Sequence, residues 1–286
     1  MADGRLTFLR QDLREALVAG AERDPACSAT GAAWLLRGAA AAAAVGLCLY
    51  LLGGYHAGFL GLNALAAAAP AWLWERLTVL GDERVAFALT LLFARRHPRV
   101  FWTLIWAALV ATAYSRGLKP LVDAARPPAV LAADAFNLIG PGHRHEGFPS
   151  GHSVTASVFF GVLVYHARRR RWRVLFVALA VLAGLSRVAV GVHWPVDVAA
   201  GLAGGALAAW IGPWLARGTA RAMYDANLHL AFVAVAAVMA VSLWLDDGGY
   251  AAAALPLRVL SAVALSYALL SYLLLPLWRG SWRGWA

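Results

Sequence analysis

Residues 172–216 have the sequence WRVLFVALAVLAGLSRVAVGVHWPVDVAAGLAGGALAAWIGPWLA. Two apolar runs within it, 172–190 and 196–216, are each long enough to cross a lipid bilayer, which takes about 17–25 residues. Four polar residues stand where the two runs meet: Ser186, Arg187, His193 and Asp197. An ionisable side chain at membrane depth costs about 2.5–3.5 kcal/mol on insertion scales, so this cluster predicts a functional site at the joined ends of two spanning helices.

The composition of the chain indicates an integral membrane protein. Of its 286 residues, 62% are hydrophobic and 14% are charged, whereas about 25% of a soluble domain is charged. The net charge of +10 does not indicate a nucleic-acid partner, because the arginines recur in clusters between apolar runs instead of forming one patch. Cys27 and Cys48, the two cysteines, predict neither a disulfide nor a metal site.

Apolar runs along the chain predict an all-α, polytopic transmembrane helical bundle. The candidate spans are 32–53, 83–95, 99–116, 152–167, 172–190, 196–216, 228–246 and 253–277. We expect residues 1–31 to form an amphipathic amino-terminal arm and residues 32–216 to form a six-span core. Residues 217–286 are expected to add two spans of unassigned role and a short tail.

The distribution of basic residues predicts how this bundle is oriented. Most of the 25 lysines and arginines fall in loops on one side of an eight-span arrangement, as in the clusters 95–99 and 168–173. By the positive-inside rule, that side and both termini are cytoplasmic. Three groups of polar residues, which we call the polar islands, fall on the other side. They lie at 119–127, 149–152 and 186–197. The arginine-rich, single-lysine composition suits a bacterial inner membrane, so we expect the site to face the periplasm.

Two further polar islands lie upstream of Ser186, and their residue types suit phosphate. They are Lys119 with Arg126-Pro127, and Pro149-Ser150-Gly151-His152. Transfer of a phosphoryl group spreads negative charge over three oxygens, which Lys119 and the planar guanidinium groups of Arg126 and Arg187 can bind. Ser150 fits the N-cap of the following apolar helix, whose free amides add anion-binding donors, and Gly151 permits close backbone approach.

Proton transfer requires a second set of residues. His193 and Asp197 are four apart and would share a face of a helix, although Pro195 leaves the local turn open. A carboxylate on one imidazole nitrogen fixes the tautomer and leaves the other nitrogen free to attack. His152 is then available as the general acid. No cluster suits octahedral oxygen coordination, so we expect a metal-independent reaction without a cofactor.

The three islands together resemble the signature of the type-2 phosphatidic acid phosphatase superfamily. The matching pieces are Lys119-(six residues)-Arg126-Pro127, Pro149-Ser150-Gly151-His152, and Ser186-Arg187-(five)-His193-(three)-Asp197. This superfamily includes membrane lipid phosphatases, vanadium haloperoxidases and class A acid phosphatases. The resemblance implies a phosphohistidine at His193 oriented by Asp197, with His152 protonating the leaving group. It also implies that five residues hold the phosphoryl oxygens: Lys119, Arg126, Ser150, Gly151 and Arg187.

Several functions remain open at this level. The resemblance implies hydrolysis of a lipid phosphate or diphosphate, and its candidates are undecaprenyl diphosphate, phosphatidylglycerophosphate, phosphatidic acid and lipid A phosphates. We rank the polyprenyl diphosphate first, although nothing in the sequence identifies the lipid tail. The alternative is a phosphotransferase that passes the group to a second lipid. A haloperoxidase would normally be a soluble chain, and a transporter or scaffold would not need His152, His193 and Asp197 together.

One polar cluster has two open interpretations. The polar cluster at residues 143–146, His-Arg-His-Glu, is either a hydrated loop or a contact to a lipid headgroup. Membrane lipids are the expected partners, and the sequence does not specify an oligomeric state.

Overall fold

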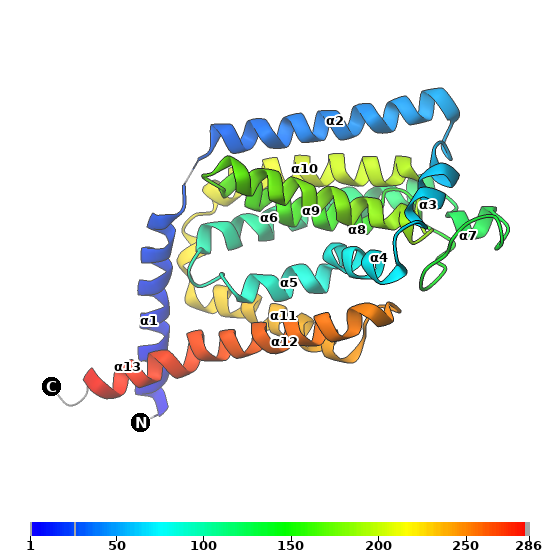
Figure 1. Ribbon diagram of the computed structural model, residues 1–286. Coiled ribbons are helices and arrows are strands. Elements are labelled where there is room, and N and C mark those ends of the chain that lie inside the picture. Colours follow the sequence, from blue (N-terminus) through cyan, green and yellow to red (C-terminus); the bar gives the residue numbers. More distant parts are fainter. Residues whose placement is uncertain (1, 26, 284–286) are drawn as a thin grey trace.

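The computed structural model describes residues 2–25 and 27–283, and this part of the chain contains helices and no strand. The helices are α1 (Ala2–Arg23), α2 (Ala29–Gly53), α3 (Phe59–Ala66), α4 (Ala71–Thr78), η1 (Val79–Gly81), α5 (Glu83–Leu91), α6 (Pro98–Val122), α7 (Pro127–Val130), α8 (Gly151–His166), α9 (Arg170–Ala189), α10 (Pro195–Gly218), η2 (Ala222–Tyr224), α11 (Ala226–Leu245), η3 (Ala251–Ala253), α12 (Ala254–Leu269), η4 (Leu270–Leu274) and α13 (Leu275–Arg283). The predicted all-α bundle is confirmed (Figure 1).

The centre of the bundle is α8, which contacts α10, α9, α6 and α2. Gly201 and Gly205 of α10 face α8 at close range. A Cβ atom at Gly201 would lie 2.7 Å from the Ser150 carbonyl oxygen, and one at Gly205 would lie 2.6 Å from the Val154 carbonyl oxygen. This Gly-x-x-x-Gly pair therefore permits close helix packing, as its spacing predicts. The contact also places the second turn of α10 beside the start of α8.

Five of the described helical segments are long and apolar enough to cross a membrane. They are Ala29–Gly53, Arg170–Ala189, Pro195–Gly218, Ala226–Leu245 and Ala251–Gly280, which match five of the eight predicted spans. The predicted span at 83–95 is wrong as a single crossing, because α5 has nine residues and rises about 14 Å against an apolar thickness of about 30 Å. The other two predicted spans, 99–116 and 152–167, correspond to α6 and α8, and neither is among these five segments. Helix α8 has only 16 residues, while α6 has 25 but is less apolar.

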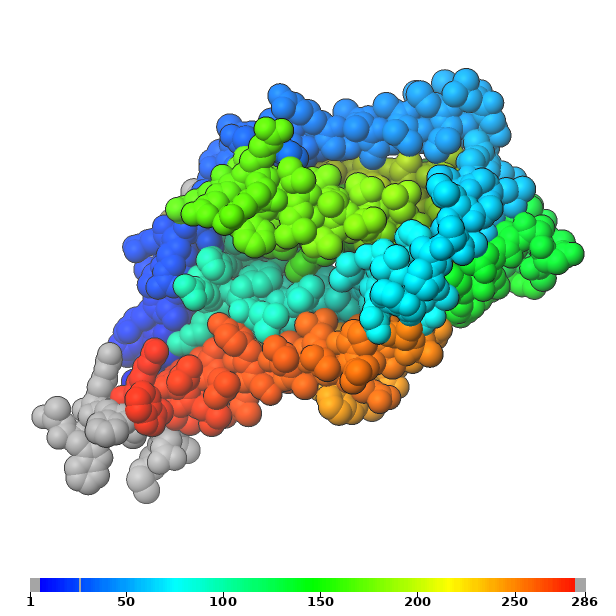
Figure 2. All heavy atoms as spheres, viewed as in Figure 1, coloured from blue at the N-terminus to red at the C-terminus, as the bar shows by residue number. Residues whose placement is uncertain are grey.

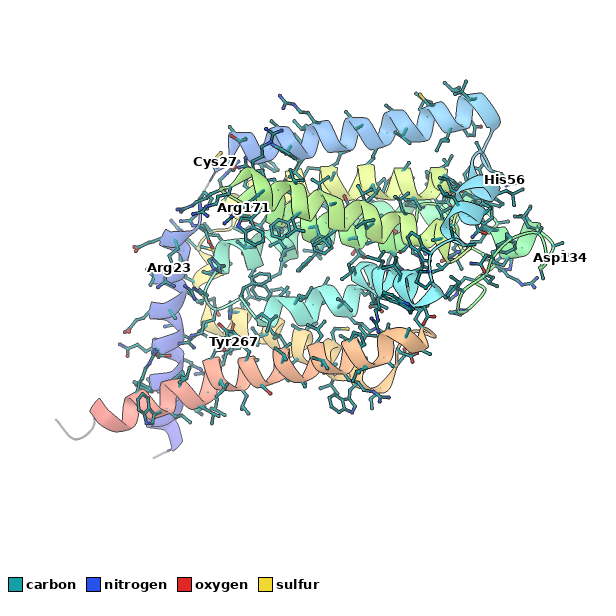
Figure 3. All side chains as sticks on the ribbon, in the orientation of Figure 1. Arg23, Cys27, His56, Asp134, Arg171 and Tyr267 are labelled. Carbon is teal, nitrogen blue, oxygen red and sulfur yellow. The ribbon has the colours of Figure 1, made fainter. Side chains whose placement is uncertain are left out.

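The two ends of the bundle differ in character. Both termini lie at one end, and α3 and α7 lie at the other (Figure 1). Figure 3 shows Arg23 and Arg171 at the end that carries the termini, while His56 and Asp134 are at the opposite end. The basic clusters and the α3–α7 end are thus separated by the length of the spanning helices. Which end faces the cytoplasm remains a prediction from the distribution of charge.

The segments outside the central helices pack against them. In the amino-terminal arm, Leu13 and Leu17 of α1 are buried beside Ala226, while Leu6 is 54% exposed. At the other end of the chain, α11 and α12 contact each other and α5. The division into an arm, a six-span core and two added spans remains a prediction, but the last two long helices are packed onto the bundle.

Candidate active site

The third polar island places an imidazole beside a carboxylate just before α10. His193 is 1% exposed, and its Nδ1 lies 3.2 Å from Oδ2 of Asp197. The same oxygen accepts a hydrogen bond from the Trp194 amide at 3.0 Å, and Oδ1 accepts one from the Tyr55 hydroxyl. With both carboxylate oxygens acting as acceptors, the fitting tautomer carries its proton on Nδ1. The lone pair of His193 is then on Nε2.

The contact between His193 and Asp197 is not made across one helix face, contrary to one expectation from their spacing. Pro195 is the first residue of α10, a position that suits proline because its missing N–H has no intrahelical partner. His193 therefore precedes the helix. Asp197, the third helical residue, reaches back to the Trp194 amide, as acidic residues at this position do in a capping box.

The second polar island forms the start of α8. Ser150 is the N-cap, fully buried, and its Oγ accepts hydrogen bonds from Ser153 N at 3.4 Å and Ser153 Oγ at 2.9 Å. The predicted cap is confirmed. A Cβ atom at Gly151 would meet no described heavy atom within 4 Å, so this helix start borders open space. His152 is half-buried, and its main chain packs closely on Gly81 of η1.

The first polar island comes from the end of α6 and the start of α7. Arg126 is the N-cap of α7, and its guanidinium donates to two main-chain oxygens, that of His145 at 2.7 Å and that of Glu146 at 3.2 Å. Lys119, in the last turn of α6, places its Nζ 3.3 Å from Oε2 of Glu146. The polar cluster at 143–146 therefore holds Lys119 and Arg126, two of the three predicted phosphate-binding cations, a role that the sequence did not reveal.

The three islands meet through the main chain. The Ser150 amide donates to the Asp197 carbonyl oxygen at 3.1 Å, which joins the second island to the third. Trp194 Nε1 donates to the Ala125 carbonyl oxygen at 2.8 Å, which joins the third island to the first. A Cβ atom at Gly147 would lie 3.3 Å from Arg126 Cγ and 3.4 Å from Asp197 Oδ2. The three polar islands thus lie together in the structure.

Positive charge dominates the electrostatics of this site. Burial, followed by the charge of Arg187, lowers the pKa of Arg126 to about 10, so the guanidinium remains charged at neutral pH. Burial, followed by the charges of Arg126 and Arg187, lowers the pKa of His193 well below its ordinary value. The free imidazole is therefore neutral at neutral pH. Cations gathered at this density favour an anionic ligand.

Arg187, in the last turn of α9, is 2% exposed and lies close enough to influence His193. Its Nη1 donates to Thr78 Oγ1 at 2.6 Å and to the Tyr250 hydroxyl at 3.1 Å. Neither residue was among the predicted site residues, and neither was Tyr55. These three residues lie far along the chain from their partners, and no spacing pattern in the sequence connects them.

The arrangement combines a neutral imidazole with an oriented lone pair, a second histidine on an adjacent helix start, and three cationic side chains. It can therefore support nucleophilic attack on phosphorus with electrostatic stabilisation of the oxygens. Among residues 2–25 and 27–283, no group of three or more His, Cys, Asp or Glu side chains could hold a metal ion. Metal independence nevertheless remains a prediction for experiment.

The chain is an all-helical protein with five helices that are long and apolar enough to cross a membrane, and cationic side chains surround His193. Residues 100–220 match the PAP2 superfamily, and all three polar islands lie within this segment. PAP2 abbreviates the type-2 phosphatidic acid phosphatase name, so the superfamily predicted from the motifs is confirmed for this part of the chain.

Curated relatives share parts of the chain. A lipid A 1-phosphatase of Rhizobium johnstonii is 39% identical over 109 residues, which is 37% of this chain and 42% of the relative. An undecaprenyl-diphosphatase of Sulfolobus acidocaldarius is 32% identical over 143 residues, which is 47% of this chain and 64% of the relative. The chain thus spans less than two thirds of the length of these relatives. The crystal structure of Aquifex aeolicus LpxE aligns with a TM-score of 0.49 and 28% identity, covering 54% of this chain and 91% of that one.

Proposed function

We propose that this protein is a membrane lipid phosphatase that hydrolyses a lipid phosphate or diphosphate through a phosphohistidine at His193. The observation that carries the proposal is the hydrogen bonding of His193. Its Nδ1 is held by Asp197, whose carboxylate is fixed in turn by Trp194 and Tyr55. The Nε2 lone pair is therefore oriented, and it belongs to a neutral imidazole surrounded by cations that attract phosphate.

The proposed reaction has two steps. In the first, the Nε2 lone pair forms a bond to phosphorus while the bond from phosphorus to the leaving oxygen breaks, and His152 gives its proton to that oxygen. In the second, His152 takes a proton from water, the water oxygen bonds to phosphorus, and the P–N bond breaks to release inorganic phosphate. The carboxylate of Asp197 stabilises the imidazolium cation that exists between the two steps.

The phosphoryl oxygens are assigned to the surrounding donors. Arg126, Arg187 and Lys119 supply the positive charge, and the Ser150 hydroxyl and the amides at the start of α8 supply further hydrogen bonds. Glu146 pairs with Lys119, so we expect a bound phosphate to displace or share this ion pair. Because these donors are already in position before the reaction begins, they stabilise the transition state without a free-energy cost for reorganisation.

The substrate class is a phosphate or diphosphate on a membrane lipid. The five apolar helices and the relatives named lipid A 1-phosphatase and undecaprenyl-diphosphatase support this class. We propose that the site faces the periplasm of a bacterial inner membrane and that both termini are cytoplasmic. Undecaprenyl diphosphate and a lipid A 1-phosphate are the first two substrates to compare.

The first expected result concerns the reaction class and its metal requirement. Protein purified in detergent should release inorganic phosphate from at least one of these lipids in excess EDTA, because the charge on phosphorus is neutralised by side chains. When a reaction with radiolabelled substrate is quenched, the protein should carry an acid-labile, alkali-stable label, as expected for the proposed phosphohistidine. Dependence of release on added magnesium would contradict this mechanism. Appearance of the label on a second lipid, without free phosphate, would identify a phosphotransferase instead.

The second expected result concerns pH. His193 must be neutral to attack, and the charge of Arg126 helps to keep its pKa low. Arg126→Gln removes that charge, so the pKa of His193 rises and more of the imidazole is protonated at mildly acidic pH. The acid limb of kcat/KM, which reports the free enzyme, should therefore move to higher pH.

Arg116→Gln provides the matched control for this charge change. Arg116 is exposed on α6 and is not among the charges that shift the pKa of His193. It should leave the acid limb in place. If the acid limb of the kcat/KM profile is at the same pH in Arg126→Gln and in the wild type, protonation of the His193 imidazole does not limit activity.

A further inference from the structure

The guanidinium of Arg187 donates hydrogen bonds through Nη1, whereas its Nε has no partner among the described residues. Nη1 donates to both Thr78 Oγ1, at 2.6 Å, and the Tyr250 hydroxyl, at 3.1 Å. Nε is buried and has no hydrogen-bond partner within the described part of the chain. Buried donors are nearly always paired, so an unpaired N–H at an anion site suggests a place for a ligand oxygen.

The two partners of Arg187 come from outside the PAP2 segment at 100–220. Thr78 is the last residue of α4, and Tyr250 immediately precedes η3 in the turn between α11 and α12. Both are buried, with Thr78 fully inaccessible and Tyr250 4% exposed. The elements that hold this end of Arg187 are therefore the short helix α4 and the last two long helices, to which the sequence assigned no role.

The turn that carries Tyr250 is tied to α4 and α5. The Ala252 amide donates to Glu75 Oε2 at 2.7 Å, and Arg76 Nε donates to the Ala252 carbonyl oxygen at 3.2 Å. Arg84 Nη1 lies 2.9 Å from Asp246 Oδ2. Figure 2 shows the surface of α4 against that of the η3–α12 segment. These contacts bring the start of α12 to the site end of the bundle.

The ring of Tyr250 is confined by the loop before α8. A Cβ atom at Gly140 would lie 2.6 Å from Tyr250 Cε1, so only glycine leaves room for the ring there. On the other side of the turn, Gly248 and Gly249 have φ angles of 70° and 82°, which glycine adopts without steric cost. The hydroxyl of Tyr250 is thus held in place for Arg187 by both loops.

We propose that Tyr250 is a positioning residue for Arg187, supplied by the carboxy-terminal helix pair. Together with Thr78 it occupies Nη1, which leaves the Nε–Nη2 edge of the guanidinium for two oxygens of the phosphoryl group. That edge is one of those through which arginine binds oxyanions bidentately. This inference rests on the proposed phosphatase function, and it makes α11 and α12 part of the active site.

The test is Tyr250→Phe, which keeps the ring and removes the hydroxyl. Because the interaction orients a group that stabilises the transition state, kcat should fall about 10-fold with little change in KM. Tyr272→Phe is the matched control, since Tyr272 lies in the same carboxy-terminal segment and its hydroxyl bonds His229 at 2.8 Å instead of a site residue. It should retain kcat within about two-fold of the wild type.

A double-mutant cycle separates positioning from a general structural role. If Tyr250 acts through Arg187, then Tyr250→Phe added to Arg187→Gln should change kcat no further. An unchanged kcat in the single variant overturns the inference. So does an equal fall in the Arg187→Gln background, because that shows an effect independent of the guanidinium.

An oxyanion titration keeps the inference separate from the proposed function. Inorganic vanadate should bind the wild type more tightly than Tyr250→Phe, whatever the natural substrate. If the wild type releases no phosphate from any lipid phosphate, the proposed function fails, and the titration still decides whether Tyr250 positions Arg187. Equal vanadate affinity in both proteins overturns the inference.

Discussion

Replacement of His193 by Gln should abolish phosphate release, with a loss of about 10⁴-fold or more in kcat. Glutamine retains a polar side chain of similar length but has no nitrogen lone pair that can attack phosphorus. His193 is buried and bonded to Asp197, so another residue cannot take its place by a small movement. The measurement is single-turnover release from a lipid phosphate, with the trapped phosphoenzyme counted in parallel.

His97→Gln is the control for this substitution. His97 precedes α6, and its Nδ1 lies 2.6 Å from Oδ1 of Asp24, which directly follows α1, well away from the three polar islands. It should retain both activity and phosphoenzyme. Residual labelling of His193→Gln at wild-type stoichiometry would assign the nucleophile to another residue, and His152 would then be the first to replace.

Asp197→Asn should reduce kcat by about 10²–10⁴-fold while the protein remains folded. Both oxygens of Asp197 are acceptors, for the Trp194 amide, the Tyr55 hydroxyl and the His193 ring. An amide replaces one acceptor with a donor, so at least one of these hydrogen bonds is lost. It also removes the negative charge that stabilises the imidazolium, and it favours the tautomer in which Nε2 carries the proton.

Asp134→Asn separates loss of this geometry from loss of a carboxylate in general. Asp134 is exposed in the loop after α7, at the same end of the bundle (Figure 3). It should behave as the wild type in kcat and in thermal unfolding. An Asp197→Asn variant with wild-type kcat would show that His193 does not depend on the carboxylate for its tautomer, and the two-step mechanism would lose its support.

The helical class and the motif residues could be predicted from the sequence because both depend on local information. A run of apolar residues has its length and composition regardless of what it packs against, and Ser150 caps α8 through its own neighbours. The Gly201–Gly205 spacing is also local information, and it is typical of the close helix contact that the structure shows. The crossing at 83–95 was wrong because apolar composition does not show that the helix ends after nine residues.

The side chains proposed for the chemistry could be predicted from the sequence alone, since their types and spacings lie within residues 119–197. Tertiary structure alone decided which residues support them. Tyr55 is 142 residues from Asp197, Thr78 is 109 from Arg187, and Tyr250 is 63 from Arg187. Periodicity along a chain specifies the faces of single helices. Which helix ends meet depends on the packing of all of them together, and this packing brings these three hydroxyl groups to the site.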